Sequence, residues 1–147
     1  MFIDLDAFKT INDTLGHMTG DEVLKIVAKD LKTTFDGCGL AGRLGGDEFS
    51  AIIENPIEKH ELESLIGGFS SDILTVLPAP HRVSCSIGAH RYCCPADLSS
   101  LMENTDAVLY EAKSRGKARH VIRAAADTAN KAPYGSLIHK KPFGTKI

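Results

Sequence analysis

The chain has no tryptophan, and aromatic residues make up only 6% of its 147 residues. It also lacks any apolar run long enough to cross a membrane, and its first residues show no basic segment followed by an apolar stretch. The net charge of −2, from 17 basic and 19 acidic residues, gives no reason to expect bulk attraction to nucleic acid or to a membrane surface. We therefore expect a cytoplasmic protein that contacts neither nucleic acid nor, through this segment, a membrane.

The cysteines do not have the spacing of a zinc site. They stand at Cys38, Cys85, Cys93 and Cys94, and no pair is separated by two residues as in a Cys-x-x-Cys motif. Neighbouring cysteines rarely bond to each other, so the sequence predicts four reduced thiols.

What the sequence does contain is the composition of an ordinary folded domain, with 43% apolar and 24% charged residues. The length is enough for one hydrophobic core. From about Ala124 onward, the chain mixes Ala, Asn, Pro, Gly and Lys without a helical or strand period. We therefore assign residues 1–123 to a domain and residues 124–147 to a linker or poorly ordered tail.

Hydrophobic periodicity predicts strands alternating with helices. Strands are expected at residues 2–6, 40–44, 48–53, 82–91 and 118–122, and amphipathic helices from about 21, at 58–77 and at 97–115. Residues 7–14 suggest a short helical turn, and residues 15–20, with Gly16 and Gly20, suggest a loop. The buried stripe of the first amphipathic helix should comprise Val23, Leu24, Val27, Ala28 and Leu31. This order predicts an α/β (α+β) fold, with a central mixed sheet flanked by helices.

Two short acidic segments are the most informative part of the chain. Asp4 and Asp6 lie in the first predicted strand, and Asp47 and Glu48 follow the Gly45-Gly46 turn of a predicted hairpin. If the two segments meet in one sheet, their carboxylates could hold a divalent cation, which phosphoryl transfer requires. The competing interpretation is that these acids are solvated turn residues.

Several motifs together resemble a known family, the GGDEF domains, which are the diguanylate cyclases of bacterial signalling. The signature-like string is Leu44-Gly45-Gly46-Asp47-Glu48-Phe49, and further matching segments lie, in the family's order, at residues 2–9, 11–17, 20–24, 86–88 and 106–113. The resemblance covers about residues 1–122. It implies the condensation of two GTP into cyclic di-GMP with release of pyrophosphate, on a fold resembling the nucleotidyl cyclase and polymerase palm core. It also implies a catalytic homodimer, and sensory or phosphodiesterase domains elsewhere in the full-length protein.

The resemblance also assigns metal and catalytic roles to individual residues. Asp4, Asp47 and the carbonyl of Leu5 match metal ligands, for two Mg²⁺ or Mn²⁺ ions per active site. Either Asp47 or Glu48 would accept the proton of the attacking hydroxyl, and the sequence does not choose between them. Asp6 is interpreted as a helix-start or supporting residue rather than a ligand.

Other positions match the residues that bind GTP. The backbone of Ala7, Phe8 and Lys9, together with Lys113 and Lys117, corresponds to contacts with the phosphates. Asn12 and Asp21 correspond to the pair that reads guanine. Each also has a plain structural interpretation: an ordinary helix start, a basic helix end, a turn residue for Asn12, and a helix cap or first-turn acid for Asp21.

The chain departs from the family in three places. A segment that precedes the first strand in the family, with its own helix, is not in this sequence, so the domain is expected to be N-terminally incomplete. Asp36-Gly37-Cys38-Gly39 stands where many members carry the Arg-x-x-Asp of an inhibitory product site, so no such site is expected. Gly116-Lys117-Ala118 replaces a more usual Gly-Arg-Asn. These departures keep another function open, a weak or inactive GTP-binding module that regulates a neighbouring domain such as a phosphodiesterase. A third function, independent of the resemblance, is that of another metal-dependent nucleotidyl or phosphoryl transferase that uses the same carboxylates.

Overall fold

The computed structural model describes residues 1–92 and 97–124. In chain order, the elements within these ranges are β1 (Phe2–Asp6), α1 (Phe8–Leu15), α2 (His17–Thr34), β2 (Gly39–Gly45), β3 (Glu48–Ile53), α3 (Lys59–Ile73), β4 (Ser84–Arg91), α4 (Leu98–Ser114) and β5 (His120–Ala124). The tail predicted at 124–147 lies, except for its first residue, outside the described residues, and so do Cys93 and Cys94. Cys38 and Cys85 are free thiols, as expected.

The strands form one mixed sheet in the order β2-β3-β1-β4-β5. β1 is central and pairs antiparallel with both β3 and β4, while β4 pairs parallel with β5. This agrees with the predicted fold class. The acidic first strand is therefore flanked on one side by the β2–β3 hairpin and on the other by β4.

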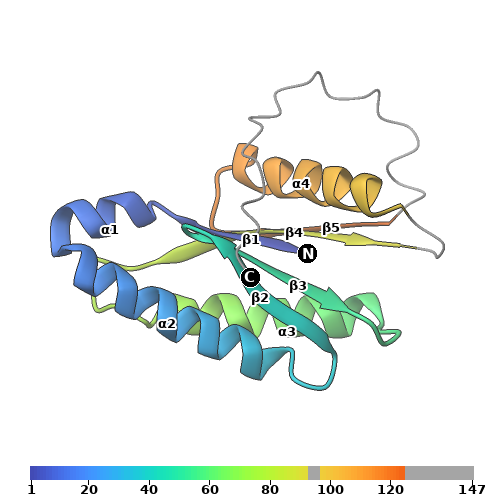
Figure 1. The fold of residues 1–147 in the computed structure, drawn as a ribbon, viewed down its shortest axis with the longest axis horizontal. Helices are drawn as coiled ribbons and strands as arrows, with labels where there is room; N and C mark the ends of the chain where they lie inside the picture. The colour runs from blue at the N-terminus through green and yellow to red at the C-terminus, as the bar shows by residue number, and fades with distance from the viewer. Residues whose placement is uncertain (93–96, 125–147) are drawn as a thin grey trace, which may run out of the picture.

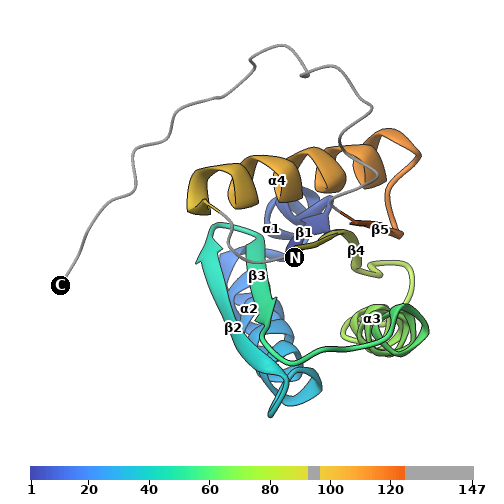
Figure 2. The ribbon, with the colours of Figure 1, turned by 90° about the vertical axis from the view of Figure 1, so that its right-hand side faces the viewer.

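The helices lie in two layers, with α4 on one face of the sheet and α2 and α3 on the other (Figure 1). Figure 2 shows the molecule after a quarter turn, with α4 above β1, β4 and β5, α3 below them, and α2 at the height of the β2–β3 hairpin. Alternating side chains of the strands, such as Ile3, Leu5 and Phe49, are buried in the main core with the apolar stripes of α2 and α3. Because alternation sends every second side chain to the opposite face, Asp4 and Asp6 are directed toward the α4 layer.

Glycine at position 88 allows α4 to pack closely on the sheet. A Cβ built on Gly88 of β4 would lie 2.2 Å from the backbone nitrogen of Leu109 and 2.5 Å from its Cα. Backbone atoms cannot swing aside as a side chain can, so only glycine permits this approach. The small cluster of Val108, Ala112 and Val121 then packs between α4 and β5.

The structure corrects the prediction between residues 7 and 34. Residues 8–15 form a complete helix, and α2 begins at His17 rather than near Asp21, so most of the predicted loop is helical. The prediction treated Gly20 as a breaker, but Gly20 is buried where α1 and α2 meet. Ala28, predicted to be buried, is exposed.

Smaller differences concern element ends. α3 ends at Ile73, four residues before the predicted end, and β5 lies two residues later than expected. Gly45 belongs to β2, so the two residues that link the hairpin strands are Gly46 and Asp47. Among the described residues, we find no helix with the length and apolarity that a membrane span requires.

Candidate active site

The acidic first strand and the tip of the hairpin lie side by side. Asp4 is paired with Glu48 in the β1–β3 register. The backbone nitrogen of Leu5 also donates a hydrogen bond to the carbonyl oxygen of Asp47, over 3.2 Å. The two acidic segments recognised in the sequence are therefore joined by backbone contacts, which fix their separation more firmly than side-chain contacts would.

The turn that carries Asp47 is stabilised by hydrogen bonds from a side chain of the same hairpin. Gly46 has a φ of +56°, a left-handed conformation that favours glycine. Its carbonyl oxygen accepts hydrogen bonds from Nε and one Nη of Arg43, over 2.9 and 2.7 Å. Asp47 is half-buried and Glu48 is exposed, so both carboxylates can be reached from solvent.

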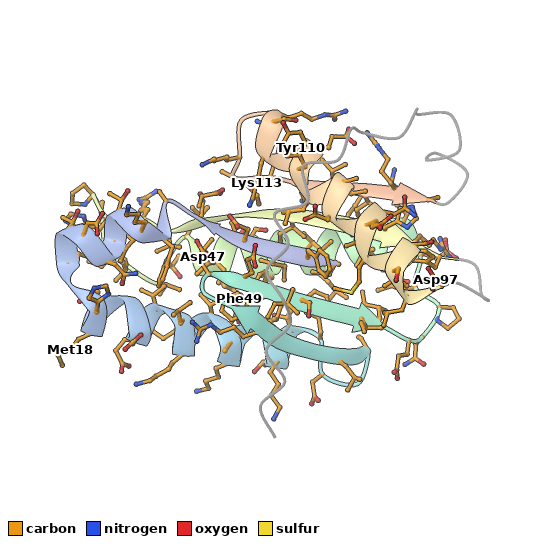
Figure 3. All side chains as sticks on the ribbon, turned by 45° about the horizontal axis from the view of Figure 1, so that its top comes forward. Met18, Asp47, Phe49, Asp97, Tyr110 and Lys113 are labelled. Carbon is orange, nitrogen blue, oxygen red and sulfur yellow. The ribbon has the colours of Figure 1, made fainter. Side chains whose placement is uncertain are left out.

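Lys113 of α4 joins Asp4 and Asp47 at this site. Its Nζ donates to Oδ2 of Asp4 over 2.7 Å, and the side chains of Lys113 and Asp4 are 32% and 16% exposed. In Figure 3, Lys113 is labelled on α4 and Asp47 near the tip of the hairpin, the two elements that flank β1 at this point. Two residues before Lys113 on α4, Glu111 pairs with Arg115 and with Arg123 of β5, which ties the end of α4 to the sheet edge.

The negative charge of Asp4 is destabilised by its surroundings. Burial raises the pKa of its carboxyl group, and the nearby charges of Asp47 and Asp6 act in the same direction, while Lys113 opposes them. A carboxylate in this situation gains from any additional positive charge that approaches it. A divalent cation between Asp4 and Asp47 would supply that charge.

The donor set suits a cation that also binds a second molecule. Among the described residues, no group of three or more His, Cys, Asp or Glu side chains is arranged to hold a metal ion. If two carboxylates and the Leu5 carbonyl held a divalent cation, several of its ligand positions would stay open. Mg²⁺ is usually held in this way in proteins, by one or two carboxylates with substrate phosphates and water as the other ligands. The residues present therefore fit a Mg²⁺ or Mn²⁺ ion that would also bind phosphate.

The start of α1 could receive an anion. Ala7 precedes the helix with a φ of +56°, and no side chain caps the first helical N–H groups. Phe8 is buried in the core, whereas Ala7 and Lys9 are exposed. Uncapped N–H groups at a helix N-terminus attract phosphate, and the three predicted phosphate contacts lie here in sequence.

The predicted guanine-reading pair lies where α1 meets α2. A Cβ on Gly20 would lie 1.9 Å from Oδ1 of Asn12, so the absence of a side chain at position 20 defines where the Asn12 amide sits. Asp21 is the next residue of α2 and is exposed. Because α2 begins at His17 and has no acidic residue in its first turn, the helix-cap interpretation of Asp21 is wrong.

The contacts of two residues in this region were not foreseen from the sequence, although Asp6 was expected to be a helix-start or supporting residue. Lys113 was placed with the phosphate contacts, but its ion pair with Asp4 was not foreseen. Asp6 is buried and accepts hydrogen bonds from Ser84 and Ser86, which lie on the same face of β4. The alternation of Ser84 and Ser86 along the predicted strand was the available signal for a buried polar partner. Lys117 is exposed, in a turn after α4.

Comparisons with known proteins agree on one family. A family model described as "Diguanylate cyclase, GGDEF domain" matches residues 1–119. The bifunctional diguanylate cyclase/cyclic di-GMP phosphodiesterase MucR of Pseudomonas aeruginosa is 33% identical over 144 residues, which is 95% of this chain and 21% of MucR. The diguanylate cyclase DosC of Escherichia coli is 36% identical over 123 residues, covering 81% of this chain and 27% of DosC.

Solved structures show the same likeness. The active GGEEF domain of a diguanylate cyclase from Vibrio cholerae superposes with a TM-score of 0.72 at 29% identity, covering 82% of this chain and 79% of that one. The GGDEF domain of DgcB from Caulobacter crescentus, solved in complex with c-di-GMP, has a TM-score of 0.73 at 28% identity, covering 85% of this chain and 75% of that one. The chain spans only about a fifth to a quarter of the two curated relatives.

Proposed function

The chain belongs to the GGDEF domain family, and we propose that it is the catalytic domain of a diguanylate cyclase, joining two GTP molecules into cyclic di-GMP. One observation carries the proposal. The hydrogen bond from Leu5 to Asp47 and the ion pair between Asp4 and Lys113 bring two carboxylates and an ammonium group together at one point of the sheet. Carboxylates that can hold a divalent cation, and a positively charged side chain that can bind phosphate, are components that nucleotidyl transfer needs.

The reaction consists of two equivalent transfers. In each, the 3′-hydroxyl oxygen of one GTP forms a bond to the α-phosphorus of the other. The bond from that phosphorus to the bridging β-phosphate oxygen breaks, and pyrophosphate leaves. The hydroxyl proton passes to a base. When bound, the divalent cations lower the pKa of the hydroxyl and offset the charge on the leaving pyrophosphate.

The residues of this chain have different roles in the reaction. Asp4, Asp47 and the Leu5 carbonyl hold the cations, and Asp47 or Glu48 accepts the hydroxyl proton. Lys113, already oriented 2.7 Å from Asp4, stabilises negative charge on the phosphates as it develops. Lys117 and the N–H groups of Ala7, Phe8 and Lys9 bind the remaining phosphate oxygens.

Base selection is assigned to the junction of α1 and α2. The carboxylate of Asp21 accepts from the N1–H and exocyclic amine of guanine, and the Asn12 amide completes the edge. Adenine lacks those donors, so ATP would leave the Asp21 carboxylate without partners. The arrangement therefore favours GTP.

Two copies of the domain are needed because one copy holds one GTP and each transfer needs two. The hydroxyl of one nucleotide must face the α-phosphate of the other, so the domains meet site to site as a homodimer. Specific activity should therefore rise with protein concentration until the dimer is saturated. The presence of sensory or phosphodiesterase domains in the full-length protein is part of the same proposal, supported by the bifunctional relative.

The test is incubation with GTP and Mg²⁺ or Mn²⁺, followed by chromatographic detection of cyclic di-GMP. We expect product from the wild type and at least a hundredfold less from Asp47→Asn, which keeps the shape of the side chain but removes its charge. Asp36→Asn removes the same charge from an exposed turn and should leave the rate unchanged. Equal losses in both variants would contradict the assignment.

Other results would select the competing functions. GTP bound tightly but never converted, at any protein concentration, would indicate a regulatory module rather than an enzyme. Turnover of ATP but not GTP would indicate a different nucleotidyl transferase and would refute the role of Asp21. A specific activity independent of protein concentration would contradict the requirement for a dimer.

A further inference from the structure

Asp6 is a buried carboxylate, and both of its oxygens accept hydrogen bonds from other parts of the chain. It lies two residues after Asp4 on β1 and is only 8% exposed. Oδ2 accepts from the Ser84 hydroxyl over 2.8 Å and from the backbone nitrogen of Ala118 over 3.0 Å, and Oδ1 accepts from the Ser86 hydroxyl over 2.8 Å. With both oxygens occupied by donors of the chain, Asp6 is not available as a cation ligand.

The Ala118 contact fixes an unfavourable turn. Gly116, Lys117 and Ala118 all have positive φ values, of +111°, +60° and +47°. Glycine adopts such angles readily, but lysine and alanine do not, because Cβ then crowds the backbone. Two successive residues persist in this conformation only when their surroundings impose it.

Contacts at the C-terminal end of the turn and just after it impose this conformation. Asp6 accepts from Ala118 at the end of the turn. The next residue, Arg119, donates from Nε to the carbonyl of Lys117 over 3.1 Å, and its own carbonyl accepts from Ile87 of β4 over 2.9 Å. Asp6 is the only one of these partners that lies on β1, the strand that also carries Asp4.

The turn follows directly on the end of α4 that carries Lys113, so the two lysines depend on the two aspartates in different ways. Lys113 contacts Asp4 through its side chain. The backbone of Lys117 is fixed between Gly116 and the Ala118 amide that Asp6 holds. Lys117 is exposed and has no ion pair within the described ranges, so its ammonium group is available to a ligand.

We infer that Asp6 is a positioning residue for the nucleotide phosphates. It holds the left-handed turn 116–118 against the end of β1, and the turn presents Lys117 beside Lys113. The inference rests on the proposed function, since it assumes a triphosphate at this site. It assigns Asp6 a role through Lys117 and no contact with substrate or cation.

The test is a double-mutant cycle on nucleotide affinity. The affinity of a non-hydrolysable GTP analogue is measured in Mg²⁺ for the wild type, Asp6→Ala, Lys117→Ala and the double variant. We expect each single change to weaken binding about tenfold and the double change to weaken it no further than Lys117→Ala alone, because both remove the same contact. Additive losses, or an unchanged affinity in Asp6→Ala, would overturn the inference.

Two further variants separate positioning from stability. Asp6→Asn should bind nearly as tightly as the wild type, because the amide oxygen still accepts from Ala118 and the amide nitrogen can donate to the Ser86 hydroxyl. Ser84→Ala removes a hydrogen bond to the same carboxylate oxygen but leaves the turn in place, so it should lower thermal stability and keep the affinity. If Ser84→Ala weakens binding as much as Asp6→Ala, the inference is overturned.

Hydrogen exchange at the Ala118 amide gives a reading that needs no nucleotide. This N–H should be protected in the wild type and in Asp6→Asn, and it should exchange rapidly in Asp6→Ala. Rapid exchange in the wild type would overturn the inference even if Asp6→Ala fails to fold. A wild type that binds no GTP would refute the proposed function instead, and the exchange experiment would still decide whether Asp6 holds the turn.

Discussion

The two ends of the candidate site are built in different ways. At the carboxylate end, Asp4, Asp47 and Lys113 come from β1, the β2–β3 turn and α4, which are far apart in sequence. The Leu5–Asp47 hydrogen bond and the Asp4–Lys113 ion pair join them. At the helix end, Asn12 and Asp21 come from two consecutive helices that meet at Gly20. The carboxylate end is held by sheet register and the helix end by local packing.

This difference predicts how each end responds to change. A substitution at the carboxylate end alters charges that act on one another at short range, so its effect should appear in rate and in pH dependence. A substitution at the helix end changes the position of a side chain but leaves the charges of the carboxylate end unchanged. Its effect should therefore appear in the preference for guanine over adenine. A variant at one end that changed both the rate or its pH dependence and the base preference would contradict this separation.

Among the changes that separate the two ends, loss of the ammonium group at the carboxylate end should have the largest effect. Lys113→Met keeps most of the apolar stem, but it removes the charge that stabilises the phosphates and partners Asp4. We expect cyclic di-GMP formation to fall about a hundredfold, the usual scale for losing one charge-stabilising group, with the preference for GTP over ATP unchanged. Lys32→Met, on the exposed end of α2, is the matched control and should retain the wild-type rate.

A methyl group at the crossing of α1 and α2 should affect only the helix end. In Gly20→Ala, the new Cβ would stand 1.9 Å from Oδ1 of Asn12, and the flexible amide would rotate away. We expect the preference for GTP over ATP to fall about tenfold, the scale of one lost hydrogen bond. Competition binding with the two nucleotides measures it.

Gly67→Ala is the matched control for this substitution, because nothing lies within 4 Å of a Cβ at position 67 of α3. It should raise stability by up to about 1 kcal/mol, through the better helix propensity of alanine, without changing base preference. A loss of Mn²⁺ affinity in Gly20→Ala as large as its loss of selectivity would show that the two ends are not separable.

The sequence predicted the carboxylate end better than the helix end. Strand alternation and the Gly-Gly turn are strong local signals, and they were enough to place Asp4 next to the hairpin tip. At the helix end, glycines were interpreted as breakers, whereas Gly20 lies inside α2 and allows Asn12 to approach. A glycine needed for close packing and a glycine needed for a turn look the same in one sequence.

Contacts between distant elements were beyond the reach of the sequence for a similar reason. The residues of the Asp4–Lys113 ion pair are 109 positions apart, and those of the Asp6–Ala118 hydrogen bond are 112 positions apart. Periodicity reports which face a residue occupies, and it carries no information on which residue of another element lies opposite. The left-handed angles of Lys117 and Ala118 gave no compositional signal, because neither residue favours them.

The smallest expected effect is a shift in pH dependence that belongs to the carboxylate end alone. Burial and the charges of Asp47 and Asp6 raise the pKa of Asp4. A protonated carboxyl group does not bind a cation, so Mn²⁺ affinity in the presence of a GTP analogue should fall on acidification at a higher pH than an ordinary aspartate would require. Calorimetric titrations between about pH 4 and pH 8 measure this, above the reference aspartate pKa near 4.

The Asp4 carboxyl group should also affect stability, with the opposite pH dependence: acidification weakens Mn²⁺ binding but favours the folded state. Because the pKa of Asp4 is higher in the folded state than in the unfolded chain, the folded state binds more protons between those two pKa values. The contribution of Asp4 to the free energy of unfolding is therefore greatest at low pH and is lost as pH rises through the folded-state pKa. Asp4→Asn should remove this slope from metal-free thermal melts.

Lys113→Met should move the loss of Mn²⁺ affinity to still higher pH, because the lysine holds the pKa of Asp4 down, while Lys32→Met should leave it in place. An acid midpoint that stays in place or moves downward in Lys113→Met would contradict the sharing of Asp4 by the ammonium group and the cation.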